Sequence, residues 1–301
     1  MDSARYLLVD VFTGEPFGGN QLAVFVDGAA VPERLMQPIA RELNLSETTF
    51  VLPPADPENL CRLRIFTPLE ELPMAGHPTV GSAFALAVEG RVTAPATIRF
   101  EEGVGPVPVE VEGEGDRPTG AVMIQPLPAF GPRLDDPGRT AAMLGLDASD
   151  IVPGLPLEVV SCGVPYLIVP LASLAAVQRA RLRPDLWQEL LGDFASRHVY
   201  LFSRETLGND ATIHARMFAP AAGVPEDPAT GSASGPVGCY LVRHGLLAGG
   251  VRVPIVCEQG YEIGRPSRIE VAISGEGERI REVRVGGGCV LVGEGRMRLP
   301  G

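Results

Sequence analysis

Three titratable side chains lie where they could move protons in a reaction. Glu47 begins the β-branched and aromatic run ETTFVL, His77 lies in AGHPT, and Asp227 lies in PEDPAT. Burial of a carboxyl group among apolar residues raises its pKa and allows proton exchange near neutral pH. Each residue also has a structural interpretation: Glu47 as a strand-end carboxylate, His77 as a turn residue, and Asp227 as a helix N-cap. General acid/base chemistry is one of two interpretations that the residues leave open.

Glycines and a serine accompany the His77 and Asp227 loops. Gly76 precedes His77, and the pair Gly231 and Ser232 follows Asp227. Free N–H groups at a helix start, with the positive end of the helix dipole, can bind an anionic group of a substrate. Close helix packing is the alternative use of these glycines. Ser232 is not part of a G-x-S-x-G elbow, so a hydrolase nucleophile is not indicated.

The two loops belong to stretches that echo one another. RIFTPLEELPMAGHPTVGSAFAL is followed later by RMFAPAAGVPEDPATGSASGPVGCYL, and both proceed from an Arg-x-Phe strand to a Gly-Ser-Ala helix. Aligning Pro78 with Pro228 places His77 opposite Asp227, each at the start of its helix. The sequence therefore predicts two copies of one unit, whose two helix starts would face a shared cleft.

Strands must position most of these residues. Residues 5–12 and 21–28 predict an opening hairpin, and Glu47 is expected near the beginning of a later strand. Pro32 can begin a helix that Pro38 would kink or delay. Residues 113–120, rich in Gly, Glu, Asp and Pro, are expected to be a linker. Because strands outnumber helices and each half has its strongest helix after its loop, we expect an α+β duplication and not a doubly wound parallel sheet.

Composition excludes several classes of function. The 37 acidic and 25 basic residues give a net charge of -12, which would repel a nucleic acid backbone. No apolar run approaches the roughly 20 residues of a membrane helix, and no leader is evident, so we expect a cytoplasmic protein. Five scattered cysteines and four scattered histidines indicate neither disulfides nor a metal site. Without a cofactor-binding loop, we expect proton transfer with no cofactor.

The segments DVFTGEPFGGNQLAVF, ARELNLSETTFV, SCGVPYLIV and the two echoed stretches, in this order, resemble the PhzF-like phenazine biosynthesis family, whose fold is related to that of diaminopimelate epimerase. The resemblance implies two pseudo-symmetric domains, each a curved, mostly antiparallel sheet around a central apolar helix. We expect residues 1–117, joined by the last strand near 288–301, to form one domain and residues 118–287 the other. The active site would lie in the cleft between them.

The resemblance also implies a cofactor-independent isomerase and a homodimer. Its substrate would be a small, cyclic carboxylate similar to trans-2,3-dihydro-3-hydroxyanthranilate. Glu47 would be the general acid/base, with His77 and Asp227 orienting or protonating the substrate. Ser232 would hydrogen-bond the substrate, and the amides of two glycines, Gly76 and Gly231, would hold its carboxylate.

One departure from the family pattern lies at the rim of the expected cleft. Family members commonly read Gly-Asn-Pro where this chain has Gly19, Asn20 and Gln21. Asn20 is therefore a candidate substrate-binding residue, and the change at Gln21 bears on specificity.

Two other functions remain open from the sequence. One is a two-base epimerase that uses Glu47 with His77 or Asp227, because neither position carries the cysteine of a thiol-dependent epimerase. The other is a non-catalytic protein of the same fold that binds small molecules.

Overall fold

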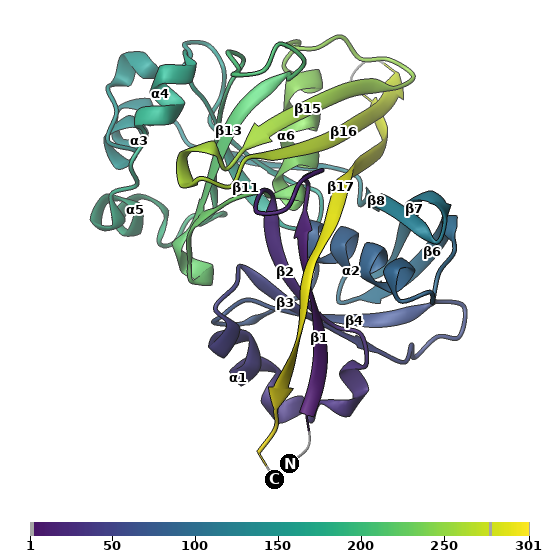
Figure 1. Cartoon of the computed structure of the whole chain (residues 1–301). Helices are drawn as coiled ribbons and strands as arrows, with labels where there is room; N and C mark the ends of the chain where they lie inside the picture. The colour runs from purple at the N-terminus through teal and green to yellow at the C-terminus, as the bar shows by residue number, and fades with distance from the viewer. Residues whose placement is uncertain (1–2, 277–278, 301) are drawn as a thin grey trace. The chain divides into compact units, whose positions relative to one another are not determined.

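The computed structural model describes residues 3–276 and 279–300, which form two compact units (Figure 1). Of the described residues, those within 1–124, 222–224 and 284–301 form the first unit, and those within 125–221 and 225–283 form the second. Within the described residues, no helix is long and apolar enough to cross a membrane.

The first unit is a sheet with one buried helix. Its elements are β1 (Ser3–Val11), β2 (Asn20–Phe25), η1 (Gly28–Ala30), α1 (Glu33–Leu43), β3 (Glu47–Leu52), β4 (Cys61–Phe66), β5 (Glu71–Leu72), α2 (Gly76–Val88), β6 (Ala94–Glu102), β7 (Gly105–Gly115), β8 (Arg117–Gln125) and most of β17 (Arg279–Arg298). In Figure 1 the purple β1 and the yellow β17 run side by side, and the two strands pair antiparallel.

The second unit repeats this plan. Its elements are β9 (Ala129–Arg133), α3 (Pro137–Met143), η2 (Ala148–Asp150), β10 (Glu158–Ser161), β11 (Pro165–Pro170), α4 (Leu174–Arg179), α5 (Pro184–Leu191), β12 (Val199–Ser203), β13 (Ile213–Ala219), η3 (Pro220–Ala222), β14 (Val224–Asp227), α6 (Gly231–Arg243), β15 (Val253–Gln259), η4 (Tyr261–Ile263) and β16 (Ser267–Glu276). A core of apolar side chains from β10 to β13 and from α3, α4 and α5 lies within this unit.

The order of strand pairings confirms the duplication. In the first unit the pairs β1–β2, β2–β3, β3–β4, β4–β6 and β6–β7 are in turn antiparallel, parallel, antiparallel, parallel and antiparallel. The second unit gives the same succession through β10–β11, β11–β12, β12–β13, β13–β15 and β15–β16. The predicted α+β fold, with mostly antiparallel sheets, is confirmed.

Each unit encloses one apolar helix. Every residue of α2 except Val88 is buried, and every residue of α6 except Arg243 is buried. A helix that is apolar on all sides is stable only inside a protein. Gly81 serves this packing, because a Cβ at that position would press on the side chains of Val11 and Leu22. Gly81 therefore lets α2 pack closely on β1 and β2, not on a second helix.

Some local predictions are wrong in detail. Residues 113–120 form the turn of the β7–β8 hairpin, in which Gly113 pairs with Pro118, and are not a linker. Helix α1 begins at Glu33 and continues through Pro38, so that proline does not delay the helix start. The opening hairpin of β1 with β2, and the strand that begins at Glu47, are confirmed.

Candidate active site

Three polar side chains meet at one point in the first unit. Asn20 is the first residue of β2, Glu47 is the first residue of β3, and His77 is the second residue of α2. The Asn20 amide nitrogen lies 3.1 Å from His77 Nδ1, and Glu47 Oε2 lies 3.4 Å from His77 Nε2. Asn20 and His77 are buried, while the Glu47 side chain is 14% exposed to solvent. The imidazole thus bridges an amide and a carboxyl group that retains access to solvent.

The backbone brings these residues together for local reasons. Gly19 has a φ of 62°, and a Cβ there would collide with the Val11 carbonyl oxygen. A glycine at this position therefore lets the chain turn sharply and begin β2 at Asn20. Parallel pairing of β2 with β3 sets Leu22 opposite Glu47, so Asn20 and Glu47 begin neighbouring strands at the same end of the sheet.

His77 is a neutral imidazole at neutral pH. Burial lowers its pKa to about 3, and a hydrogen bond with the Gln21 backbone offsets this only in part. Desolvation disfavours the charged form, and the nearby carboxyl group of Glu47 does not reverse that. The contact of His77 with Glu47 is therefore between a neutral ring and a carboxyl group, which suits it to orient Glu47.

The starts of α2 and α6 are alike. Gly76 and Gly231 are the first residues of these helices, both are buried, and neither N-cap residue, Ala75 or Thr230, makes a side-chain capping bond. The first N–H groups of a helix have no partner within the helix. Backbone amides at both helix starts are therefore not taken by a capping side chain.

In the second unit, Asp227 does not cap a helix. It is the last residue of β14, and its Oδ2 accepts a hydrogen bond of 2.5 Å from the Thr230 hydroxyl. The Gln259 amide donates to the Asp227 carbonyl oxygen and to Thr230 Oγ1, and its oxygen accepts from Thr230 N. These bonds hold the chain out of helical geometry until Gly231. The N-cap interpretation of Asp227 is wrong for this reason.

Ser232 has a partner that the sequence did not single out. Its Oγ lies 2.6 Å from the hydroxyl oxygen of Tyr166, and both residues are buried. Tyr166 is the second residue of β11 and lies in the segment SCGVPYLIV. On the other side of the helix start, the Gln125 amide donates to the Gly231 carbonyl oxygen. The signal for Tyr166 is its place in that segment; no spacing indicates Gln125.

The helix starts correct the alignment of the two halves. The sequence echo sets His77 opposite Asp227, but the second residue of α2 is His77 and the second residue of α6 is Ser232. The residue at the start of the second strand of the parallel pair also differs between the halves. It is Glu47, opposite Leu22, in β2–β3, and it is Val199, opposite Leu167, in β11–β12. At the position equivalent to Glu47, the second unit therefore has Val199.

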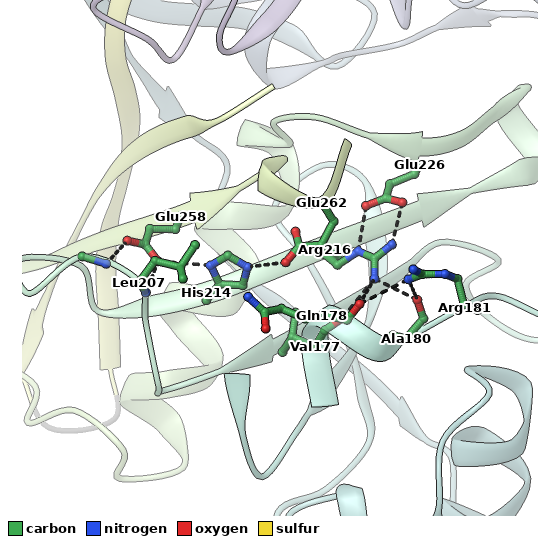
Figure 2. A network of polar contacts seen from close by, with 11 residues as sticks. Val177, Gln178, Ala180, Arg181, Leu207, His214, Arg216, Glu226, Glu258 and Glu262 are labelled. Carbon is green, nitrogen blue, oxygen red and sulfur yellow. Dashed lines mark hydrogen bonds and ion pairs between the residues drawn. The ribbon is translucent and has the colours of Figure 1, made fainter. Parts of the chain in front are cut away.

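The arginine that opens both echoed stretches ties its strand to the following loop. In the second unit Arg216 makes two hydrogen bonds to Glu226 and donates to the carbonyl oxygens of Val177 and Ala180 (Figure 2). In the first unit Arg64 makes the equivalent two bonds to Glu71. These arginines hold the loops and do not extend the candidate site.

A second histidine is enclosed by carboxylates. His214 Nδ1 lies 3.1 Å from Glu258 and His214 Nε2 lies 2.8 Å from Glu262 (Figure 2). Burial opposes the charged ring, but the hydrogen bonds to Glu262 and Glu258 outweigh it and raise the pKa of His214. Glu258 also accepts from the backbone N–H groups of Leu207 and Gly208. This network fastens a loop to β13 and β15.

Comparison with known proteins identifies the family. A family model described as phenazine biosynthesis-like protein matches residues 9–295. The chain belongs to the PhzF family. It is 40% identical to the trans-2,3-dihydro-3-hydroxyanthranilate isomerase of Pseudomonas aeruginosa over 295 residues, which cover 98% of this chain and 99% of the relative. The prediction of an isomerase is confirmed.

Solved structures agree with this assignment. A PhzF-family phenazine biosynthesis protein of Bacillus anthracis is 27% identical, with a TM-score of 0.89 over 99% of this chain and 100% of that one. A probable proline racemase of Agrobacterium radiobacter is 14% identical, with a TM-score of 0.69 over 99% of this chain and 93% of that one, which shows a shared fold alone. The predicted relation to the epimerase-like fold is confirmed.

Proposed function

We propose that this PhzF-family isomerase moves a proton between carbons of trans-2,3-dihydro-3-hydroxyanthranilate or of a similar cyclic carboxylate. The observation that carries the proposal is Glu47, a partly exposed carboxyl group at a strand start, 3.4 Å from a buried imidazole. The similarity to an isomerase named for that substrate supports the choice of compound.

Glu47 is the proposed general acid/base. A carboxyl group at the edge of a buried site can take a proton from one carbon and return it to another, provided that its pKa lies near the working pH. His77, neutral because of its lowered pKa, is not an imidazolium donor at neutral pH. We therefore assign His77 the task of orienting Glu47, and Asn20 that of fixing the ring of His77.

Further groups complete the proposal. The amides of Gly76 and Gly231 bind the substrate carboxylate, since both helix starts lack a side-chain cap. Asp227 and Ser232 act on the same substrate, as the sequence resemblance implies. Ser232 hydrogen-bonds it, and Asp227 orients or protonates it.

Deuterium incorporation tests the proposal directly. Purified protein is incubated in deuterated water with the anthranilate compound and a panel of small carboxylates, and products are followed by mass spectrometry and proton NMR. Incorporation at a carbon with relocation of a double bond is the expected result. Inversion of one centre without relocation would instead show an epimerase, and binding without any exchange would indicate a non-catalytic protein.

The Glu47→Gln variant is the control. It keeps the shape of the side chain but removes the titrating group, so it should fold normally and lose at least 100-fold in turnover, the scale on which general acid/base groups contribute. Retained turnover would overturn the role of Glu47. Asp227→Asn and Ser232→Ala, measured in the same assay, test the contribution of the second unit.

The cytoplasmic location and the homodimer belong to this proposal as well. The family resemblance is their support. Sedimentation analysis of the purified protein checks the homodimer, and fractionation of cells that produce it checks the location.

A further inference from the structure

A buried carboxyl group lies behind the first turn of α2 and has no part in the proposed reaction. Glu102, the last residue of β6, is 6% exposed. Its Oε1 lies 2.6 Å from Thr79 Oγ1, and the same Thr79 oxygen lies 2.6 Å from the carbonyl oxygen of Ala75. Ala75 is the N-cap residue of α2 and directly precedes Gly76 and His77.

The number of protons in this chain of contacts determines the state of Glu102. A threonine hydroxyl has one proton to donate, and a backbone carbonyl oxygen has none. One proton cannot serve both contacts fully; if Thr79 donates to the Ala75 carbonyl oxygen, the Thr79 oxygen can accept from a neutral Glu102. An ionised Glu102 would leave two oxygen atoms 2.6 Å apart without a proton between them. A neutral Glu102 is the state in which each of the two contacts has a proton of its own.

The surroundings favour the same state. Burial raises the pKa of Glu102 to about 8, and the hydrogen bond that Thr79 would donate to the ionised form offsets this only in part. Glu102 Oε2 is buried without a hydrogen-bond partner among the described residues. The thiol of Cys61 on β4 is buried, and the charge of an ionised Glu102 would raise the pKa of that thiol further.

A hollow of about 400 Å³ adjoins this carboxyl group. Its other charged lining residues are Arg62 and Arg64 of β4, Glu71 of β5 and Glu101 of β6. Arg64 is engaged with Glu71, and Arg91, the remaining cation near Cys61, pairs with Asp27. Arg64 and Arg91 are therefore paired with carboxylates other than Glu102.

We propose that Glu102, as a neutral acid, is a positioning residue that fixes the first turn of α2, and with it His77, through Thr79 and the Ala75 carbonyl group. Ionisation of Glu102 removes the proton that Thr79 accepts. Thr79 then turns its own proton toward the new carboxylate and releases the Ala75 carbonyl oxygen. The N-cap loosens, and His77 shifts relative to Glu47.

The imidazole of His77 is a reporter that needs no substrate. The chain has four histidines, so the His77 ring signals can be assigned by their loss in a His77→Gln variant. In the wild-type protein we expect these signals to move with a midpoint near pH 8, the pKa of Glu102. Glu102→Gln keeps a donor toward Thr79 but cannot ionise, so the transition should vanish. Glu101→Gln, on the same strand, should keep it.

Thr79→Val is the second variant. It removes the hydroxyl that links Glu102 to α2, so the His77 signals should lose the transition although Glu102 still titrates. A transition near pH 8 that persists in Glu102→Gln and Thr79→Val would overturn the proposal, and so would a wild-type protein without one. Either variant alone decides the question if the other does not fold.

A kinetic measurement extends the proposal and rests on the proposed function. The value of kcat/KM in the wild type should fall about tenfold between pH 7 and pH 9, because one pH unit above the pKa leaves about a tenth of the acid neutral. Glu102→Gln should retain its value over that range. Absence of turnover by the wild type would count against the proposed isomerisation, and the NMR result would still decide the role of Glu102.

Discussion

At the scale of the residue, His77 shows how burial assigns a role. With its pKa lowered to about 3, His77 enters the folded protein uncharged, whereas an exposed histidine in the unfolded chain titrates near pH 6.5. Between these values the unfolded chain binds more protons than the folded protein. The stability that the neutral His77 contributes to the folded protein is therefore fully present above about pH 6.5. It is lost progressively as the pH falls toward about 3, the pKa of His77 in the folded protein.

The prediction is a pH-dependent difference between wild type and His77→Gln. Well inside that window each pH unit should cost the wild type about 1.4 kcal/mol relative to the variant, which amounts to about 1.6 kcal/mol between pH 6.5 and pH 5. Urea unfolding at both pH values measures the difference. His214 titrates in both proteins and cancels in the comparison. A difference independent of pH would show that the pKa of His77 is the same in the folded and unfolded states.

The candidate residues could be named from the sequence because each belongs to a short segment typical of the family. The structure brings Glu47, His77 and Asn20 into one cluster. The contact of Tyr166 with Ser232, in contrast, could not be inferred from composition or spacing. A tyrosine next to a proline in an apolar strand is expected in any core. Only the fold brings its hydroxyl to 2.6 Å from Ser232.

At the scale of the element, the arginine clamps differ in burial although they derive from the same repeat. The Arg216 side chain is 4% exposed and its partner Glu226 is 15% exposed, whereas Arg64 and Glu71 are 16% and 41% exposed. Loss of one partner from a buried ion pair leaves an uncompensated charge, while an exposed pair contributes little.

We therefore expect Arg216→Met to lower the free energy of unfolding by about 3 kcal/mol or more, and Arg64→Met by about 1 kcal/mol or less. Methionine retains the apolar stem in both variants, so the comparison isolates the charged group. Chemical denaturation of the two variants measures the costs. Equal costs would mean that the burial of Arg216 has no bearing on its stability contribution.

The tie between β11 and the start of α6 leads to another prediction. Tyr166→Phe removes only the hydroxyl that holds Ser232, and we expect kcat to fall about tenfold, the effect of losing one buried hydrogen bond of about 1.4 kcal/mol. Tyr240→Phe is the matched control, because it removes a hydrogen bond of 2.8 Å to the Pro156 carbonyl oxygen. Steady-state assays of both variants give the comparison, and equal activities would exclude a role for Tyr166 in positioning Ser232.

Helix starts were the weak point of prediction at this scale. The sequence echo aligns the Gly-Ser-Ala triplets, yet α2 begins at Gly76, before its triplet, and α6 begins at Gly231, within its own. The difference arises from Gln259, which lies far along the chain and holds Asp227 and Thr230 in a non-helical turn. Local sequence cannot report a bond from such a distant residue.

At the scale of the whole molecule, the duplication was readable from the sequence because both halves keep the same strand, loop and helix. The pairing of strands was not readable, because parallel pairs such as β2–β3 and β13–β15 depend on contacts between distant segments. The β7–β8 hairpin was predicted as a linker for a related reason: Gly, Asp and Pro are as common in tight turns as in linkers.

Each unit contains an apolar core cluster of its own, so we expect the two units to lose structure one at a time. One core cluster, which includes Phe50, lies within the first unit, and another, which includes Trp187, lies within the second. Trp187 is the single tryptophan of the chain, so its fluorescence reports on the second unit, whereas circular dichroism reports on both.

Phe50→Ala should destabilise the first unit by roughly 3–5 kcal/mol. We expect its circular dichroism to show an early transition in urea that Trp187 fluorescence does not follow, while Trp187 reports the wild-type midpoint. Coincident transitions by both probes, shifted together, would show instead that the units unfold as one cooperative body.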